Sequence, residues 1–210
     1  MAKTNKFVRD LVKIMDKRRK VFDESLKGSD RDIAIVAVCL IDSLLERLLK
    51  SYFIKNGGVN NLFENEHILQ TYHAKVNIAH FSGLIPSFLY NDLLLIGRIR
   101  NKFAHKLDSS ISFMDAEISN LVKDFKFKPK SAEDDIKDIR MKYVVIISAV
   151  SSFLTYIQLL IVFHKRQGKL ILLRDIMKLD ESPFEEMSPT ESEIQKIISN
   201  TRIKKRKKSK

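Results

Sequence analysis

The stretch YVVIISAVSSFLTYIQLLIVF, residues 143–163, decides the fold class of this chain. It carries no charged residue along its whole length, and it is long enough to cross a bilayer as an α-helix. A membrane span can use a stripe of small residues for helix pairing, and so can the central helix of a soluble bundle. Small polar residues do recur along this stretch at helical spacing: Ser148, Ser151, Ser152, Thr155 and Gln158.

The rest of the chain favours the soluble bundle. Six Gly and four Pro are few for 210 residues, and apolar residues repeat at intervals of three and four. No segment alternates in the manner of a β-strand. Several one-sided helices therefore need an apolar partner, and residues 143–163 can supply it. We expect an all-α fold, a single helical bundle of about five or six helices, and no membrane span.

Start and stop signals place the other helices. A first amphipathic helix is predicted over residues 4–27, ending near Gly28. Ser29 is a suitable N-cap for the next helix, which runs to about residue 53, and Asp32 completes a capping box. A shorter helix begins near residue 71 and ends at the Ser-Gly pair 82–83. Pro86 suits the first turn of a helix over residues 86–107, and a short amphipathic helix follows within 112–125.

Charge separates a folded region from its ends. The formal net charge is +12, but the last nine residues, RIKKRKKSK, hold seven Lys and Arg, which leaves 12 − 7 = +5 for the rest. We divide the chain into an N-terminal helix (1–28), a helical domain (29–166) and a flexible extension (167–210). The tail is expected to be disordered and to contact polyanions non-specifically. Its basic residues are Arg202, Lys204, Lys205, Arg206, Lys207, Lys208 and Lys210.

Absent motifs exclude several kinds of chemistry. The lone cysteine, Cys39, rules out an intrachain disulfide, and its apolar neighbours predict a buried structural thiol. The chain lacks a glycine-rich phosphate loop, paired cysteines and a zinc-protease motif, so we expect no metal and no cofactor. No helix-turn-helix is evident. The N-terminal sequence does not resemble a secretory signal, and we expect a cytoplasmic protein.

The stretch RIRNKFAHKL, residues 98–107, holds the candidate functional residues. At about 100° per residue, the core face of this helix includes Arg100 between Ile96 and Phe103. The nearly opposite face mixes apolar and hydrogen-bonding groups, a composition typical of a protein interface. That predicted interface comprises Tyr90, Leu94, Arg98, Asn101 and His105.

Arg100 on a core face requires a carboxylate partner, because an unpaired buried guanidinium would cost several kcal/mol. Asp42 and Glu46 are the available acids on the helix over residues 29–53. The structural hypothesis is therefore an ion pair from Arg100 to Asp42 or Glu46 that holds two helices together.

Residues 22–165 resemble the mannitol operon repressor (MltR-like) family. The similarity is carried, in order, by SDRDIAIVAVCLIDSLLERLLKSYF, TYHAKVNIAHFSGLI, LLLIGRIRNKFAHKL, SFMDAEI and the final apolar helix. It implies a compact all-helical protein that is linked to transcriptional control and lacks a standard DNA-binding element. We accordingly expect a regulatory protein that acts through protein contacts rather than by reading DNA bases.

RNKFAH also resembles the signature of the HEPN superfamily, an arginine followed by a polar residue and a histidine a few positions later. The resemblance implies a metal-independent endoribonuclease, a toxin or defence effector, in which Arg100, Asn101 and His105 line a cleft between two protomers. An imidazole can transfer a proton while a guanidinium stabilises the phosphorane. Both resemblances fit a homodimer. The first adds a protein partner, and the second offers RNA as the alternative.

Overall fold

The structure, a computed structural model, describes residues 20, 22–53, 58–64, 67–105, 111–127 and 136–166, with side chains as far as residue 162. Within these ranges the chain forms α-helices and one short 3-10 helix, η1 (Asn61–Phe63), and no strand. The predicted all-α bundle is confirmed. All of these residues belong to one compact unit, Met1–Ile176. Most of the predicted N-terminal helix and the whole basic tail lie outside the described residues.

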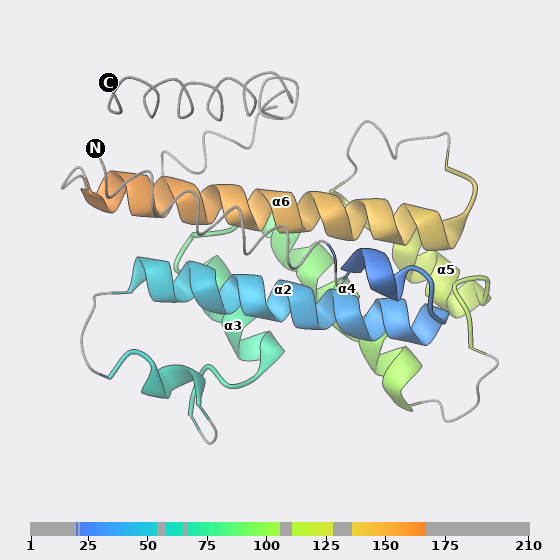
Figure 1. The fold of residues 1–210 in the computed structure, drawn as a ribbon, viewed down its shortest axis with the longest axis horizontal. Helices are drawn as coiled ribbons and strands as arrows, with labels where there is room; N and C mark the ends of the chain where they lie inside the picture. The colour runs from blue at the N-terminus through green and yellow to red at the C-terminus, as the bar shows by residue number, and fades with distance from the viewer. Residues whose placement is uncertain are drawn as a thin grey trace, which may run out of the picture. The chain divides into compact units, whose positions relative to one another are not determined.

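Two long helices form the centre of the bundle. Helix α2 (Asp30–Tyr52) and helix α6 (Ile139–Arg166) pack along each other and run in the same direction (Figure 1). Contacts at both ends fix this orientation, because Arg140 pairs with Asp30 while Gln158 Nε2 donates to Ser51 Oγ at 3.1 Å. Helix α2 begins with the predicted capping box between Ser29 and Asp32. Hydrogen bonds from Ser29 lower the pKa of the Asp32 carboxyl.

Three shorter helices pack around this pair. Helix α3 (Tyr72–Phe81) and helix α4 (Ser87–His105) contact each other and α2, and helix α5 (Ala116–Lys123) contacts α4 and α6. Helices α3 and α4 are antiparallel, since Tyr72 bonds to Leu93 and Tyr90 bonds to Asn77. Four of the largest buried side chains are aromatic and contact one another in a row, with successive ring centroids 4.9–6.3 Å apart. They connect α4, α6 and the segments flanking α5, in the order Phe103, Phe113, Tyr143 and Phe125.

Helix α6 is the apolar stretch that meets the length criterion for a membrane span. In Ile139–Val162, 56% of the apolar window is buried within the protein, as in the central helix of a bundle. The hydroxyls of Ser148, Ser151, Ser152 and Thr155 donate to carbonyls one turn earlier in the same helix. Thr155 and Gln158 are buried, whereas Ser148 and Ser152 are exposed. Only part of the polar stripe therefore faces a neighbouring helix.

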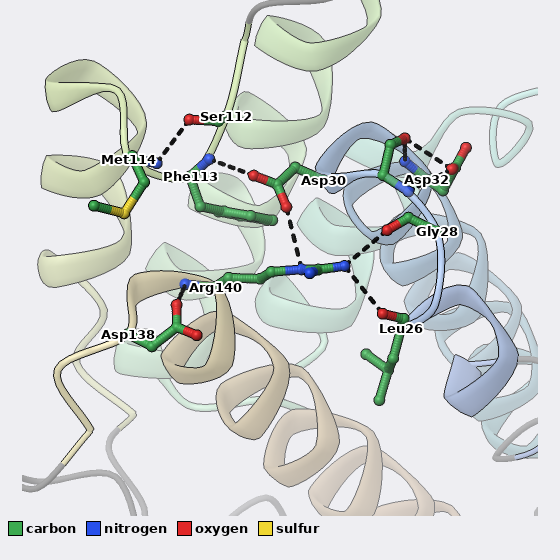
Figure 2. A network of polar contacts seen from close by, with 10 residues as sticks. Leu26, Gly28, Asp30, Asp32, Ser112, Phe113, Met114, Asp138 and Arg140 are labelled. Atoms are coloured by element: carbon green, nitrogen blue, oxygen red, sulfur yellow. Dashed lines mark hydrogen bonds and ion pairs between the residues drawn. The ribbon is translucent and has the colours of Figure 1, made fainter.

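Arg140 joins the first turn of α6 to the start of α2 (Figure 2). Its Nε lies 3.1 Å from Asp30 Oδ1, and its Nη2 donates to the carbonyls of Leu26 and Gly28 at 3.0 and 2.8 Å. Asp30 Oδ2 accepts the backbone N–H of Phe113 at 2.8 Å. One ion pair thus ties together α2, α6 and the segment that leads into α5.

The prediction for Cys39 was wrong, because its side chain is exposed. The neighbouring Val38 and Ile41 are buried, and a helix turns about 100° per residue. Cys39 therefore faces away from the core despite its apolar neighbours in sequence.

Candidate functional site

The outer face of α4 carries the predicted interface residues. Arg98, Asn101 and His105 are exposed, and Tyr90 and Leu94 are half-buried. The opposite face of the helix forms core, with Leu89, Ile96 and Phe103 fully buried among others. The helix is two-sided as its sequence indicates, and the interface itself stays a prediction.

An aromatic cluster lies at one end of this face, where α3 ends. The rings of His80 and Tyr90 are stacked with centroids 4.3 Å apart, and Phe81 lies 5.3 Å from His80 and 6.3 Å from Tyr90. Tyr90 also donates to Asn77 Oδ1 at 3.1 Å. Although it is in the last turn of α3, Phe81 remains 77% exposed.

The turn after α3 fixes the position of this cluster. Gly83 has a φ of 64°, in the left-handed region that glycine adopts without strain. Its N–H donates to His80 O at 2.7 Å, and Leu84 N–H donates to Ala79 O at 2.8 Å, which together form a Schellman ending. The chain then reverses directly into α4.

Arg100, Asn101 and His105 lie within two turns of α4. Arg100 Nη1 donates to Asn101 Oδ1 at 2.9 Å, and the Arg100 side chain is half-buried rather than enclosed in the core. His105 is exposed in the last turn. The HEPN-like motif is thus accessible in one protomer, and its catalytic role stays a prediction.

A buried lysine occupies the position expected for an arginine. Lys75 Nζ on α3 lies 2.7 Å from Asp42 Oδ2 and 3.6 Å from Glu46 Oε2 on α2, and the lysine side chain is only 4% exposed. Glu46 also pairs with Lys50 at 2.7 Å. Both acids do link two helices, but the cation that lies against them is Lys75. A bridge from Arg100 to either acid stays a prediction.

Tyr72, three residues before Lys75 on α3, contacts α4. Its hydroxyl donates to Leu93 O at 2.9 Å, and its ring packs against Gly97, where an added Cβ would lie 3.1 Å from Tyr72 Cε1. Burial raises the pKa of Tyr72 well above its usual range, Asp42 raises this pKa further, and Arg100 opposes the shift. The hydrogen bond of Arg100 itself goes to the neighbouring Asn101.

Asp92 is the acid that the sequence interpretation missed. It is fully buried on α4, and its two carboxylate oxygens accept the backbone N–H groups of Lys126 and Phe127 at 2.8 and 2.7 Å. Hydrogen bonds to a charged acceptor contribute about 1.5–3 kcal/mol each. Asp92 thus holds the chain that leaves α5 against α4, which is a structural role.

The described residues contain no group of three or more His, Cys, Asp or Glu side chains placed to hold a metal ion. The seven predicted polyanion-binding residues of the tail lie outside the described residues.

Comparison with known proteins finds one similar fold. No protein-family model matches the chain, and no curated protein matches its sequence. A chain in the X-ray structure of the MtlR–HPr complex from Escherichia coli is similar, with a TM-score of 0.53 and 17% identity over 66% of this chain and 98% of that one. The two chains share a fold of the MltR-like kind, an all-helical bundle.

Proposed function

We propose that this chain is an MltR-like regulatory protein that acts on transcription through protein–protein contacts rather than by direct base reading. The observation that carries the proposal is the exposed face of α4, on which aromatic, aliphatic and arginine side chains lie together. Tyr, Phe and Arg are enriched at protein interfaces, and a few such residues supply most of the binding energy. The structural neighbour was determined as a complex with another protein, HPr, which supports this proposal.

The test is a titration of the purified full-length chain with HPr, both from Escherichia coli and from the organism that encodes this chain. Saturable binding that weakens in Arg98→Glu supports the proposal. Lys123→Glu is the matched control, because Lys123 is an exposed cation on α5 and is not one of the predicted interface residues. If the chain instead binds operator DNA sequence-specifically after residues 202–210 are deleted, the folded domain reads DNA and the proposal is wrong.

A metal-independent endoribonuclease is the second candidate, favoured by the accessibility of the motif on α4. In this proposal Arg100 and His105 of two protomers form the site in a homodimer. Three results would support it together. RNA cleavage survives EDTA, His105→Ala abolishes cleavage without loss of stability, and mixing Arg100→Ala with His105→Ala protomers restores part of the activity. If the wild-type dimer leaves single-stranded and structured RNA intact, this alternative fails.

A further inference from the structure

Phe81 is the most exposed aromatic side chain in the described part of the protein, and its ring contacts those of His80 and Tyr90. Phe81 is 77% exposed, as much as the aliphatic side chain of Ile68 (76%) and the side chain of Met114 (77%). Phe81 rests on His80, which stacks on Tyr90. A preorganised aromatic ring loses little conformational freedom on binding, so Phe81 suits the role of an interface anchor.

The surface around this anchor carries no exposed acid from either of its two helices. The sequence of α3 contains no Asp or Glu, and the single acid of α4, Asp92, is fully buried. Arg98 is exposed on the same face, about 12 Å along the helix from Tyr90 at 1.5 Å per residue. Nearby Lys102 is already paired with Glu117 of α5. Arg98 therefore gives this face a positive charge at a distance from its aromatic cluster.

This charge distribution separates the candidate occupants. In a two-fold interface, a second copy of the chain would offer no exposed acid of α3 or α4 to pair with Arg98, which is unfavourable. A nucleic acid requires a row of cations that follows its phosphates. Of the Lys and Arg side chains in α3 and α4, Arg98 is exposed, Arg100 and Lys102 are half-buried and Lys75 is buried, so the two helices present no row of exposed cations.

We propose that the α3–α4 surface, defined by His80, Phe81, Tyr90, Leu94 and Arg98, docks a protein partner that has an apolar pocket for the Phe81 ring and an Asp or Glu side chain placed to pair with Arg98. The inference rests on the proposed function and names the chemistry of the partner. Phe81 supplies the buried contact, and Arg98 selects acidic partners over neutral ones.

The experiment uses the full-length chain and three labelled probes, namely a random copolymer of Glu and Tyr, polyglutamate, and single-stranded polyuridylate. Fluorescence anisotropy compares the wild type with Phe81→Ser and Arg98→Gln. Met114→Ser is the matched control, since Met114 is equally exposed elsewhere. Every variant retains the basic tail, so differences among variants report on the folded surface.

We expect Phe81→Ser to weaken copolymer binding about fivefold or more, without changing polyglutamate binding, because only the copolymer offers a group for the ring to contact. Arg98→Gln should weaken binding of both acidic polymers, and Met114→Ser neither. Equal copolymer binding by wild type and Phe81→Ser would overturn the inference. So would a selective loss of polyuridylate binding, or a dimer that dissociates in Phe81→Ser. If HPr does not bind but the copolymer effects are observed, only HPr is excluded as the partner, and the inference about the surface stands.

Discussion

Replacing Lys75 with methionine tests whether the buried lysine, rather than Arg100, holds α3 to α2. Methionine keeps the apolar stem but removes the charge that lies 2.7 Å from Asp42. Removing one partner of a buried ion pair costs about 3–5 kcal/mol. The side chains of Asp42 and Glu46 are 31% and 32% exposed, so water can partly solvate them once the lysine is gone. We therefore expect a loss of about 2 kcal/mol in the free energy of unfolding.

For a chain of this size, about 2 kcal/mol corresponds to a fall in Tm of about 4–8 °C. Urea denaturation followed by circular dichroism measures the loss directly, and the m-value should not change. Lys50→Met is the matched control. Lys50 lies at the same 2.7 Å from Glu46, but its side chain is 33% exposed. An exposed pair one helical turn apart contributes about 0.5 kcal/mol, so this variant should be much less affected.

Equal losses in Lys75→Met and Lys50→Met would refute the reasoning, because burial would then contribute nothing. An additional comparison with Arg100→Ala separates the two hypotheses for the acids. If Arg100→Ala destabilises the protein more than Lys75→Met does, Arg100 is the cation that stabilises the junction, as its place in the sequence predicted.

Three further predictions follow from other contacts. Arg140→Met should reduce the free energy of unfolding by about 1 kcal/mol after allowance for solvent screening, because Asp30 loses its cation. A urea denaturation midpoint equal to that of the wild type would contradict this. Gly97→Ala should lower Tm even though alanine favours helices, because its Cβ would lie 3.1 Å from the Tyr72 ring; a higher Tm would show that the ring can move. Burial raises the pKa of both Tyr72 and Tyr143. The folded state therefore binds these protons more tightly than the unfolded state, and stability should fall as pH rises through about 10. Ultraviolet difference spectroscopy should show both tyrosines ionising only as the protein unfolds.

Most of the fold was predictable from local patterns. The capping box at Ser29 and the turn at Gly83 are signals encoded by neighbouring residues. The start of α2 and the end of α3 lie where these signals predicted them. The apolar positions of α4 also predicted its buried face, because helical phase follows from the sequence of one segment. Cys39 shows the limit of this reasoning. Apolar neighbours indicated burial, but the phase of the helix decides exposure.

The candidate site depends on how separate helices meet, which local patterns do not encode. The requirement that Asp42 and Glu46 find a cation was foreseeable, but Lys75 became their partner only because α3 packs against α2. The role of Asp92 was equally hard to predict, since the backbone N–H groups that donate to it belong to Lys126 and Phe127, more than thirty residues later in the chain. In the sequence, nothing distinguishes Phe81 from the other apolar residues of α3. Its exposure follows from the Schellman turn that ends the helix.

The lysine junction and the proposed docking surface are connected through α3. That helix has only ten residues, and a helix so short is marginal in water without tertiary contacts. Lys75 anchors it to α2 through Asp42, and Tyr72 anchors it to α4 through Leu93. We expect the position of Phe81, at the far end of the same helix, to depend on these two contacts. If the proposed docking surface is correct, the ion pair between Lys75 and Asp42 thus supports binding as well as stability.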